Sequence, residues 1–115
     1  MNPHTTKNNL FSGIPQSLPA EFAEVLCRTG DMRVERIVSR GHASPPGFWY
    51  DQDQNEFVLL VKGRACLTLE GQVAPTVLEE GDWVDIKAHV RHRVDWTAPD
   101  QDTVWLAVYY VGSSQ

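Results

Sequence analysis

From Met32 onward the chain consists of short segments of strand-like composition, each closed by a turn signal after a few residues. The strongest is Glu56 to Lys62, which is nearly all apolar and stops at Gly63. The other segments of this kind are 32–39, 64–69, 76–78, 83–86, 90–96 and 103–111. We expect residues 64–69 to pair back on 56–62 as a hairpin around Gly63. Many short strands at close spacing favour an all-β sandwich or barrel.

One segment, from Pro19 to Arg28, predicts a helix. Its apolar residues recur at helical spacing, together with the residue just before it: Leu18, Phe22, Val25 and Leu26. Ser17 is placed to cap the first turn, and Gly30 follows the end. We therefore expect a short N-terminal helix ahead of the strands.

Length and charge narrow the class of protein. A chain of 115 residues fits one domain, which we expect over residues 18–115 after a partly flexible segment over 1–17. The net charge of −5, with no cluster of Lys and Arg, argues against binding nucleic acid. No segment is apolar enough to span a membrane or to act as a signal peptide, so the expected location is the cytoplasm. Cys27 and Cys66 are predicted to be buried free thiols.

Two polar residues lie on apolar strand faces. His92 shares a face with Val90 and Val94, and we expect Trp96 on the same face. Glu56 shares a face with Val58 and Leu60. An inward imidazole or carboxylate must find a partner, because an unpaired buried polar group costs about 1–3 kcal/mol. His92 is either a core histidine bonded to a backbone carbonyl, or a group that binds a metal or takes part in catalysis. The Glu56 carboxylate either reaches solvent at the end of the strand or points into a cavity, where it needs a partner.

These two residues carry a resemblance to a family. The stretch Glu56-FVLLVK-Gly63 resembles the end of the first cupin motif, and GDWVDIKAHVRH, from Gly81 to His92, resembles the second. The resemblance covers most of the chain from Met32 to Tyr110. It implies a double-stranded β-helix, or jelly-roll, barrel with one polar cavity, and a homodimer.

The chain departs from both motifs. Neither histidine of the first motif is present: with four residues before Glu56 these positions fall on Trp49 and Asp51, and with three they fall on Tyr50 and Gln52. In the second motif Lys87 replaces a proline and His89 replaces a glycine. Whether Asp51 or Gln52 points into the barrel stays open, because a one-residue slip exchanges the two faces of a strand.

The resemblance implies a set of site residues. The expected metal ligands are Asp51, Glu56 and His92, which would hold Zn, Fe, Mn or Ni, with no metal as the other possibility. The expected lining of the cavity adds Trp49, Gln52 and Trp96. Tyr50 and His42 are candidates for moving protons, His42 from a loop folded over the barrel mouth. Trp83 and Trp105 are expected to fill the core.

Three functions follow from these observations. The first is a metal-dependent enzyme acting on a small organic molecule, such as a dioxygenase or an isomerase or lyase. The second is a metal-free module that binds or senses a small ligand through His92 and Glu56. The third is a structural barrel in which these two residues form a satisfied ion pair.

Overall fold

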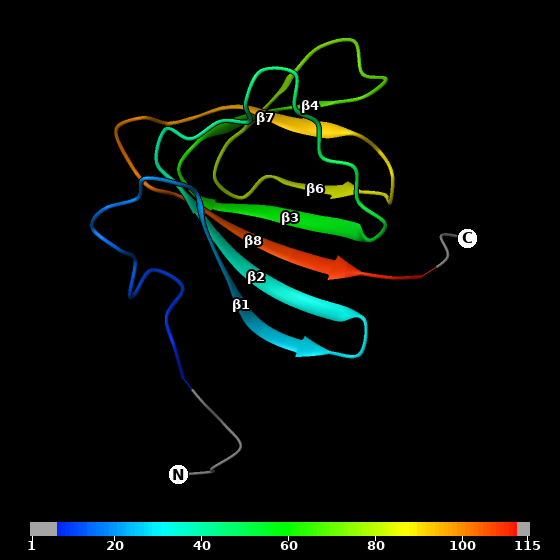
Figure 1. Cartoon of the computed structure of the whole chain (residues 1–115). Coiled ribbons are helices and arrows are strands. Elements are labelled where there is room, and N and C mark those ends of the chain that lie inside the picture. The colour runs from blue at the N-terminus through cyan, green and yellow to red at the C-terminus, as the bar shows by residue number, and fades with distance from the viewer. Residues whose placement is uncertain (1–6, 113–115) are drawn as a thin grey trace.

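The computed structural model describes residues 7–112, and part of the expected flexible segment, residues 1–6, lies outside that range. The described residues form two antiparallel sheets that face each other (Figure 1). Their eight strands are β1 (Phe22–Thr29), β2 (Met32–Ser39), β3 (Asn55–Lys62), β4 (Ala65–Leu69), β5 (Thr76–Leu78), β6 (Trp83–Ile86), β7 (His92–Thr97) and β8 (Thr103–Tyr110). The all-β fold is therefore confirmed. Between residues 7 and 112 no helix is long and apolar enough to cross a membrane.

One sheet has five strands in the order β1-β2-β8-β3-β6, and the other has three in the order β5-β4-β7. The core lies between the two sheets and is built from alternate side chains of β3, β4 and β8. Leu60 of β3 is fully buried, and Leu67 of β4 and Ala107 of β8 pack in the same cluster. This packing confirms the inward face predicted for Glu56 to Lys62.

The chain changes sheets at Gly63, so the hairpin expected there does not form. β3 pairs with β6 and β8, whereas β4 pairs with β5 and β7. Gly63 has φ of +99°, and a Cβ added to it would lie 2.5 Å from Thr103 Oγ1 and 2.7 Å from Thr103 Cα. The glycine is needed for the corner, because a side chain would occupy the space of the crossing chain.

The predicted N-terminal helix is wrong: its residues form β1, a strand at the edge of the five-stranded sheet. A bulge between Val25 and Cys27 leaves Leu26 without a partner on β2. Such a bulge breaks the period of two, and the resulting spacing of apolar residues imitates a helix. Gly30, read as a helix end, instead has φ of +52° in the two-residue turn between β1 and β2.

A second bulge lies in β7 and reverses the expected direction of Trp96. Cys66 pairs with Trp96 and Leu67 with Val94, so Asp95 is the extra residue. Val94 therefore faces the core while Trp96, 37% exposed, faces outward. Of the other aromatic and thiol expectations, Trp105 and Cys66 are buried as predicted, but Trp83 and Cys27 are exposed.

Candidate functional site

A cavity of about 230 Å³ lies between the two sheets. Its polar side chains are Glu21, Glu35, Tyr50, Gln52, Glu56, His92 and Tyr109. The remaining wall is apolar or aromatic: Ala23, Ile37, Val58, Leu67, Ile86, Val94 and Trp105. An apolar wall facing a few polar groups is typical of a site for a small organic molecule.

His92 starts β7 and points into this cavity. Its Nδ1 lies 3.0 Å from the Val90 carbonyl oxygen, so Nδ1–H donates to that oxygen and Nε2 faces Glu56, 3.6 Å from Oε1. Burial opposes protonation of the imidazole, but the Glu56 carboxylate and the Val90 carbonyl outweigh it and raise the pKa of His92 above 6.5. The bond to a backbone carbonyl is the one expected of a core histidine, and the other ring nitrogen faces the cavity.

Glu56, the second residue of β3, is 7% exposed. Its Oε1 accepts a hydrogen bond of 3.1 Å from the Gln52 amide and faces the His92 ring. Across the sheet it pairs with Tyr109 of β8. Burial, followed by the charges of Glu56 and Glu35, raises the pKa of the Tyr109 phenol, which is therefore a hydrogen-bond donor at neutral pH.

Tyr50 is fixed against His92 by backbone and ring contacts. The two residues exchange backbone hydrogen bonds of 2.7 and 3.1 Å, and their rings stack with centroids 5.3 Å apart. Phe48 packs edge-on against the Tyr50 ring, with ring centroids 4.9 Å apart. Burial, with the charges of Glu21 and Glu56, raises the pKa of Tyr50, so its hydroxyl also stays protonated.

The structure decides which residues before Glu56 face the cavity. Tyr50 and Gln52 line it, whereas Asp51 turns outward, where its Oδ1 lies 2.9 Å from Nδ1 of His89. Both side chains of that outer pair are more than half exposed. Of the two alignments of the first cupin motif, the structure fits the one with three residues between the second histidine position and Glu56. In that alignment the two histidine positions fall on Tyr50 and Gln52.

The other predicted site residues lie outside the cavity lining. Trp49 lies under the guanidinium of Arg91, and Trp96 faces outward. The ring of His42 is held by the backbone at both nitrogens: Nδ1 accepts from Arg40 N–H, and Nε2 lies 3.0 Å from the Leu18 carbonyl. The catalytic role of His42 has no geometric support here.

Sequence reasoning missed three polar residues of the cavity. Glu35 shares the inward face of β2 with Ile37, and Tyr109 shares the inward face of β8 with Trp105 and Ala107. Their positions follow from the period of two as soon as the inward face of each strand is known. Glu21 lies at the rim, and its Oε1 accepts from Ser39 Oγ. Burial raises the pKa of the Glu21 carboxyl. The sequence around Glu21 gives no sign that this residue belongs to a site.

Comparison with known proteins identifies the fold family. The family model described as "Cupin domain" matches residues 36–109. The chain belongs to the cupin family. No curated protein matches this cupin.

Solved structures have the same fold. A "putative mannose-6-phosphate isomerase" from Ralstonia eutropha JMP134 is 45% identical, with 94% of this chain and 100% of that chain covered and a TM-score of 0.91. An RmlC-like cupin with a double-stranded β-helix fold from Methanocaldococcus jannaschii is 21% identical, with 84% and 85% covered and a TM-score of 0.66. A conserved protein of unknown function from Streptococcus pyogenes is 14% identical, with 96% and 91% covered and a TM-score of 0.72.

The side chains of this cupin do not fit a metal ion well. In the cavity Glu56 and His92 stand together, and within residues 7–112 no group of three His, Cys, Asp or Glu side chains is placed to hold a metal. At the two positions where the first cupin motif has histidines, the chain has Tyr50 and Gln52. A phenol and an amide that already donates to Glu56 are poor substitutes for imidazole ligands.

The second motif keeps its backbone shape despite its substitutions. His89 stands where the motif has glycine, and its φ of +66° lies in the left-handed region that glycine adopts without strain. Its N–H donates to the Gln52 carbonyl at 2.7 Å. This turn therefore ties the second motif to the segment that carries Tyr50 and Gln52.

Proposed function

We propose that this cupin binds a small organic molecule, uncharged or cationic, through hydrogen bonds in the cavity and without a resident metal ion. The observation that carries the proposal is the pair Tyr50 and Gln52 at the inward positions of the first motif. Both are neutral groups suited to hydrogen bonding. Gln52 already bonds Glu56, and Glu56 faces His92, so the polar wall is a connected network.

The lining supports this class of ligand. It contains three carboxylates and one imidazole but neither lysine nor arginine. An anionic group such as phosphate usually needs Arg, Lys or a cluster of backbone N–H groups. At about 230 Å³ the cavity is smaller than the ~300–1,000 Å³ of pockets for drug-sized ligands, so a compact molecule fits best.

Catalysis by proton transfer is a second candidate. The protein from Ralstonia eutropha is described as an isomerase, and isomerisation of a sugar moves a proton between neighbouring carbons. In this chain His92 Nε2 would take and return that proton, and Glu56 would stabilise the imidazolium. The Tyr50 hydroxyl would give a proton to the carbonyl oxygen of the substrate and recover one from the neighbouring hydroxyl, which becomes the new carbonyl. The lining favours a sugar without phosphate for this reaction.

A metal-dependent reaction, with Zn, Fe, Mn or Ni held at Glu56 and His92, is the alternative that elemental analysis tests. The purified protein is measured as isolated and after incubation with each ion, beside His92→Ala and the double variant Tyr50→His/Gln52→His. We expect no stoichiometric metal in the wild type and a gain of metal in the double variant, which restores the motif ligands. Stoichiometric metal in the wild type that disappears in His92→Ala would overturn the metal-free proposal.

Ligand binding is tested with the same proteins by calorimetry and thermal shift. The probes are mannose and mannose 6-phosphate, which differ only in charge and size. Binding of mannose that is stronger than binding of its phosphate, and is lost in Glu56→Gln, supports the proposed ligand class. Tighter binding of the phosphate would contradict it. Interconversion of mannose and fructose, followed by chromatography, separates catalysis from binding alone.

A further inference from the structure

The segment from Ser44 to Tyr50 lies along the outer edge of β7 and carries the Tyr50 ring to the cavity. At one end, Ser44 N–H donates to the Val94 carbonyl at 2.9 Å, and the Ser44 hydroxyl accepts from Val94 N–H at 3.0 Å. At the other end, Tyr50 and His92 exchange backbone hydrogen bonds. The segment is therefore attached to β7 at both ends. We call residues 45–49, which lie between the attachments, the arch; they belong to the chain between β2 and β3 in Figure 1.

Arg93 holds the arch from outside the cavity. Its side chain points away from the cavity, because its chain neighbours His92 and Val94 both line it. Its Nη2 donates to the carbonyl oxygen of Ser44 at 3.3 Å. Its Nη1 donates to the carbonyl oxygens of Pro45 and Phe48, each also at 3.3 Å. One guanidinium thus binds backbone groups at both ends of the turn that begins the arch.

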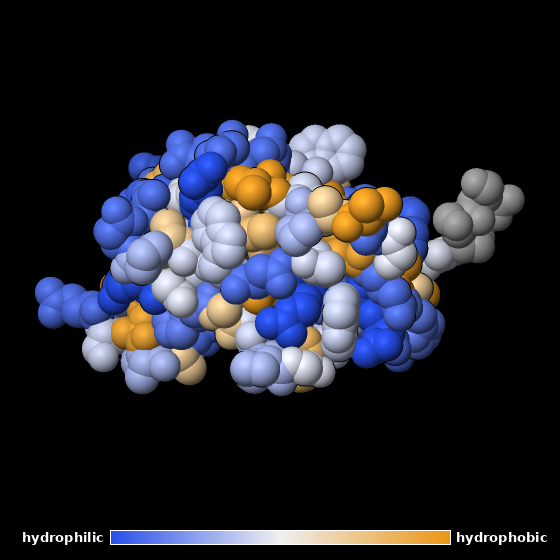
Figure 2. All heavy atoms as spheres, turned by 90° about the horizontal axis from the view of Figure 1, so that it is seen from above, coloured by the Kyte–Doolittle hydropathy of each residue, from blue (hydrophilic) through white to orange (hydrophobic). Residues whose placement is uncertain are grey.

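The Arg93 guanidinium is itself fixed by neighbouring side chains. Asp95 Oδ1 accepts from Arg93 Nε at 3.2 Å, and the other oxygen of Asp95 accepts from the Thr68 hydroxyl of β4. Figure 2 views the molecule from the side of the three-stranded sheet, where the surface mixes hydrophilic and hydrophobic residues. A guanidinium is planar and rigid, so a carboxylate that binds Nε also sets the direction of the remaining N–H groups.

The arch determines the direction of the Tyr50 ring. The Phe48 ring packs edge-on against it, and the Tyr50 ring stacks on His92 with 22° between the two planes. Phe48 is 42% exposed, so its position depends on its backbone more than on packing in the core. The backbone bonds between Tyr50 and His92 fix the main chain, but the rotamer of Tyr50 is set by the rings around it. A displaced Phe48 would therefore release the Tyr50 ring.

We propose that Arg93 is a positioning residue of the cavity: by holding the arch, it keeps the Tyr50 ring stacked on His92 and the Tyr50 hydroxyl directed at a bound ligand. Arg93 is absent from the lining of the cavity and acts through Phe48. The effect on the ligand rests on the proposed function, whereas the stacking of the two rings is independent of it. Loss of this guanidinium lowers the affinity for the ligand and leaves every group that touches the ligand chemically unchanged.

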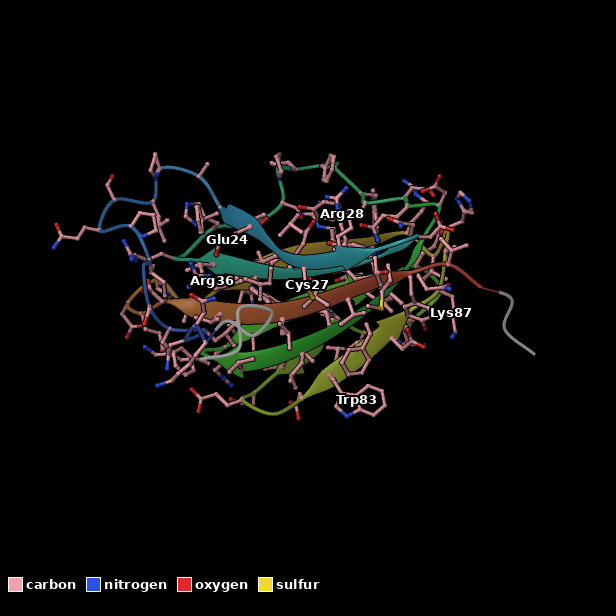
Figure 3. The ribbon with its side chains drawn as sticks, turned by 90° about the horizontal axis from the view of Figure 1, so that it is seen from below. Glu24, Cys27, Arg28, Arg36, Trp83 and Lys87 are labelled. Carbon is pink, nitrogen blue, oxygen red and sulfur yellow. The ribbon has the colours of Figure 1, made fainter. Side chains whose placement is uncertain are left out.

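A second arginine offers a matched control, because it holds another loop in the same way. Arg36 Nη1 donates to the carbonyl oxygens of Leu10 and Ser12, and its Nη2 lies 2.8 Å from Glu24 Oε1. Both chain neighbours of Arg36 on β2 line the cavity, so Arg36 lies on the opposite side of the five-stranded sheet. Figure 3 shows it there beside Glu24. Arg36→Ala therefore removes an arginine that ties down a loop but leaves the arch intact.

The first measurement is the NMR signal of the His92 ring Cε1–H, recorded at one pH and without ligand. His92→Gln assigns the signal by its absence, and Tyr50→Leu shows where it lies when the stacked ring is missing. We expect Arg93→Ala to move the signal toward its position in Tyr50→Leu, and Arg36→Ala to leave it at the wild-type position. An arginine that only stabilises the fold would lower the melting temperature, followed by circular dichroism, without moving this signal.

The second measurement is the affinity for mannose, determined by calorimetry. We expect Arg93→Ala to weaken binding by up to about tenfold, as for the loss of one hydrogen bond, and Arg36→Ala to leave the Kd unchanged. Should either alanine variant fail to fold, Arg93→Lys and Arg36→Lys are compared in its place, because lysine keeps the charge but lacks the planar fork.

The two measurements separate this inference from the proposed function. A His92 signal that stays at the wild-type position in folded Arg93→Ala or Arg93→Lys overturns the positioning role, whatever the affinity for mannose. A signal that moves while the affinity stays the same overturns the effect on the ligand. No binding of mannose to the wild type contradicts the proposed function alone, and the NMR signal then still decides whether Arg93 positions Tyr50.

Discussion

Replacing Gly63 by alanine tests how the fold turns from one sheet to the other. The new methyl group would lie 2.5 Å from Thr103 Oγ1, 2.7 Å from Thr103 Cα and 2.9 Å from the Asp102 carbonyl oxygen. Two of these three atoms belong to the backbone, and Thr103 is fully buried, so neither rotation of a side chain nor a small shift relieves the overlap.

The cost has two parts. An alanine at φ of +99° carries a backbone strain of about 1–2 kcal/mol. The steric overlap adds about 1–3 kcal/mol, as for other overpacked positions. The expected loss in the free energy of unfolding is therefore about 2–5 kcal/mol, a large part of the ~5–15 kcal/mol of a typical domain.

Gly71→Ala is the matched control, because Gly71 has φ of +90° and nothing within 4 Å of its added Cβ. It measures the strain alone, about 1–2 kcal/mol. Urea unfolding of both variants and the wild type, followed by circular dichroism, gives the two free energies. If Gly63→Ala costs no more than Gly71→Ala, the overlap with Thr103 does not exist in solution and the corner does not require a glycine.

Two further predictions concern the site. The folded protein raises the pKa of His92 above 6.5, so the charged His92 contributes stability that is fully present below pH 6.5 and is lost as the pH rises through the folded pKa. The difference in unfolding free energy between wild type and His92→Gln should therefore shrink as the pH rises from 6.5. A difference that grows with pH would contradict the pairing with Glu56. His89→Gly removes the strain of a left-handed backbone (φ of +66°) but loses the exposed contact with Asp51. Because exposed ion pairs contribute only about 0–1 kcal/mol, the melting temperature should stay equal or rise. A clear fall in melting temperature would show that the contact matters more than the strain.

The sequence was sufficient where the pleat ran without interruption. The alternation of β3 predicted that Glu56 shares a face with Val58 and Leu60, and in the structure all three side chains are buried on the inward face. The same reasoning placed His92 inward, beside Val94. Both predictions rest on the period of two, which holds as long as each residue has a partner on the next strand.

It failed where a bulge interrupts that period. The extra residue Leu26 made β1 resemble a helix, and the extra residue Asp95 turned Trp96 away from the core. Bulges depend on the neighbouring strand, so a single strand's sequence does not reveal them. The corner at Gly63 has the same character, because the reason for the glycine is Thr103, forty residues along the chain.

The cavity wall itself restricts the ligand. Each of its three carboxylates already accepts one hydrogen bond or ion pair from the chain: Glu21 from Ser39, Glu35 from Arg33 and Glu56 from Gln52. A carboxylate offers about four acceptor sites, so each retains acceptor capacity after that contact. A molecule that completes this wall must bring hydrogen-bond donors, and hydroxyl or ammonium groups do so, whereas a phosphate brings more acceptors. The acceptor-rich wall thus argues for a donor-rich ligand independently of whether a metal is present.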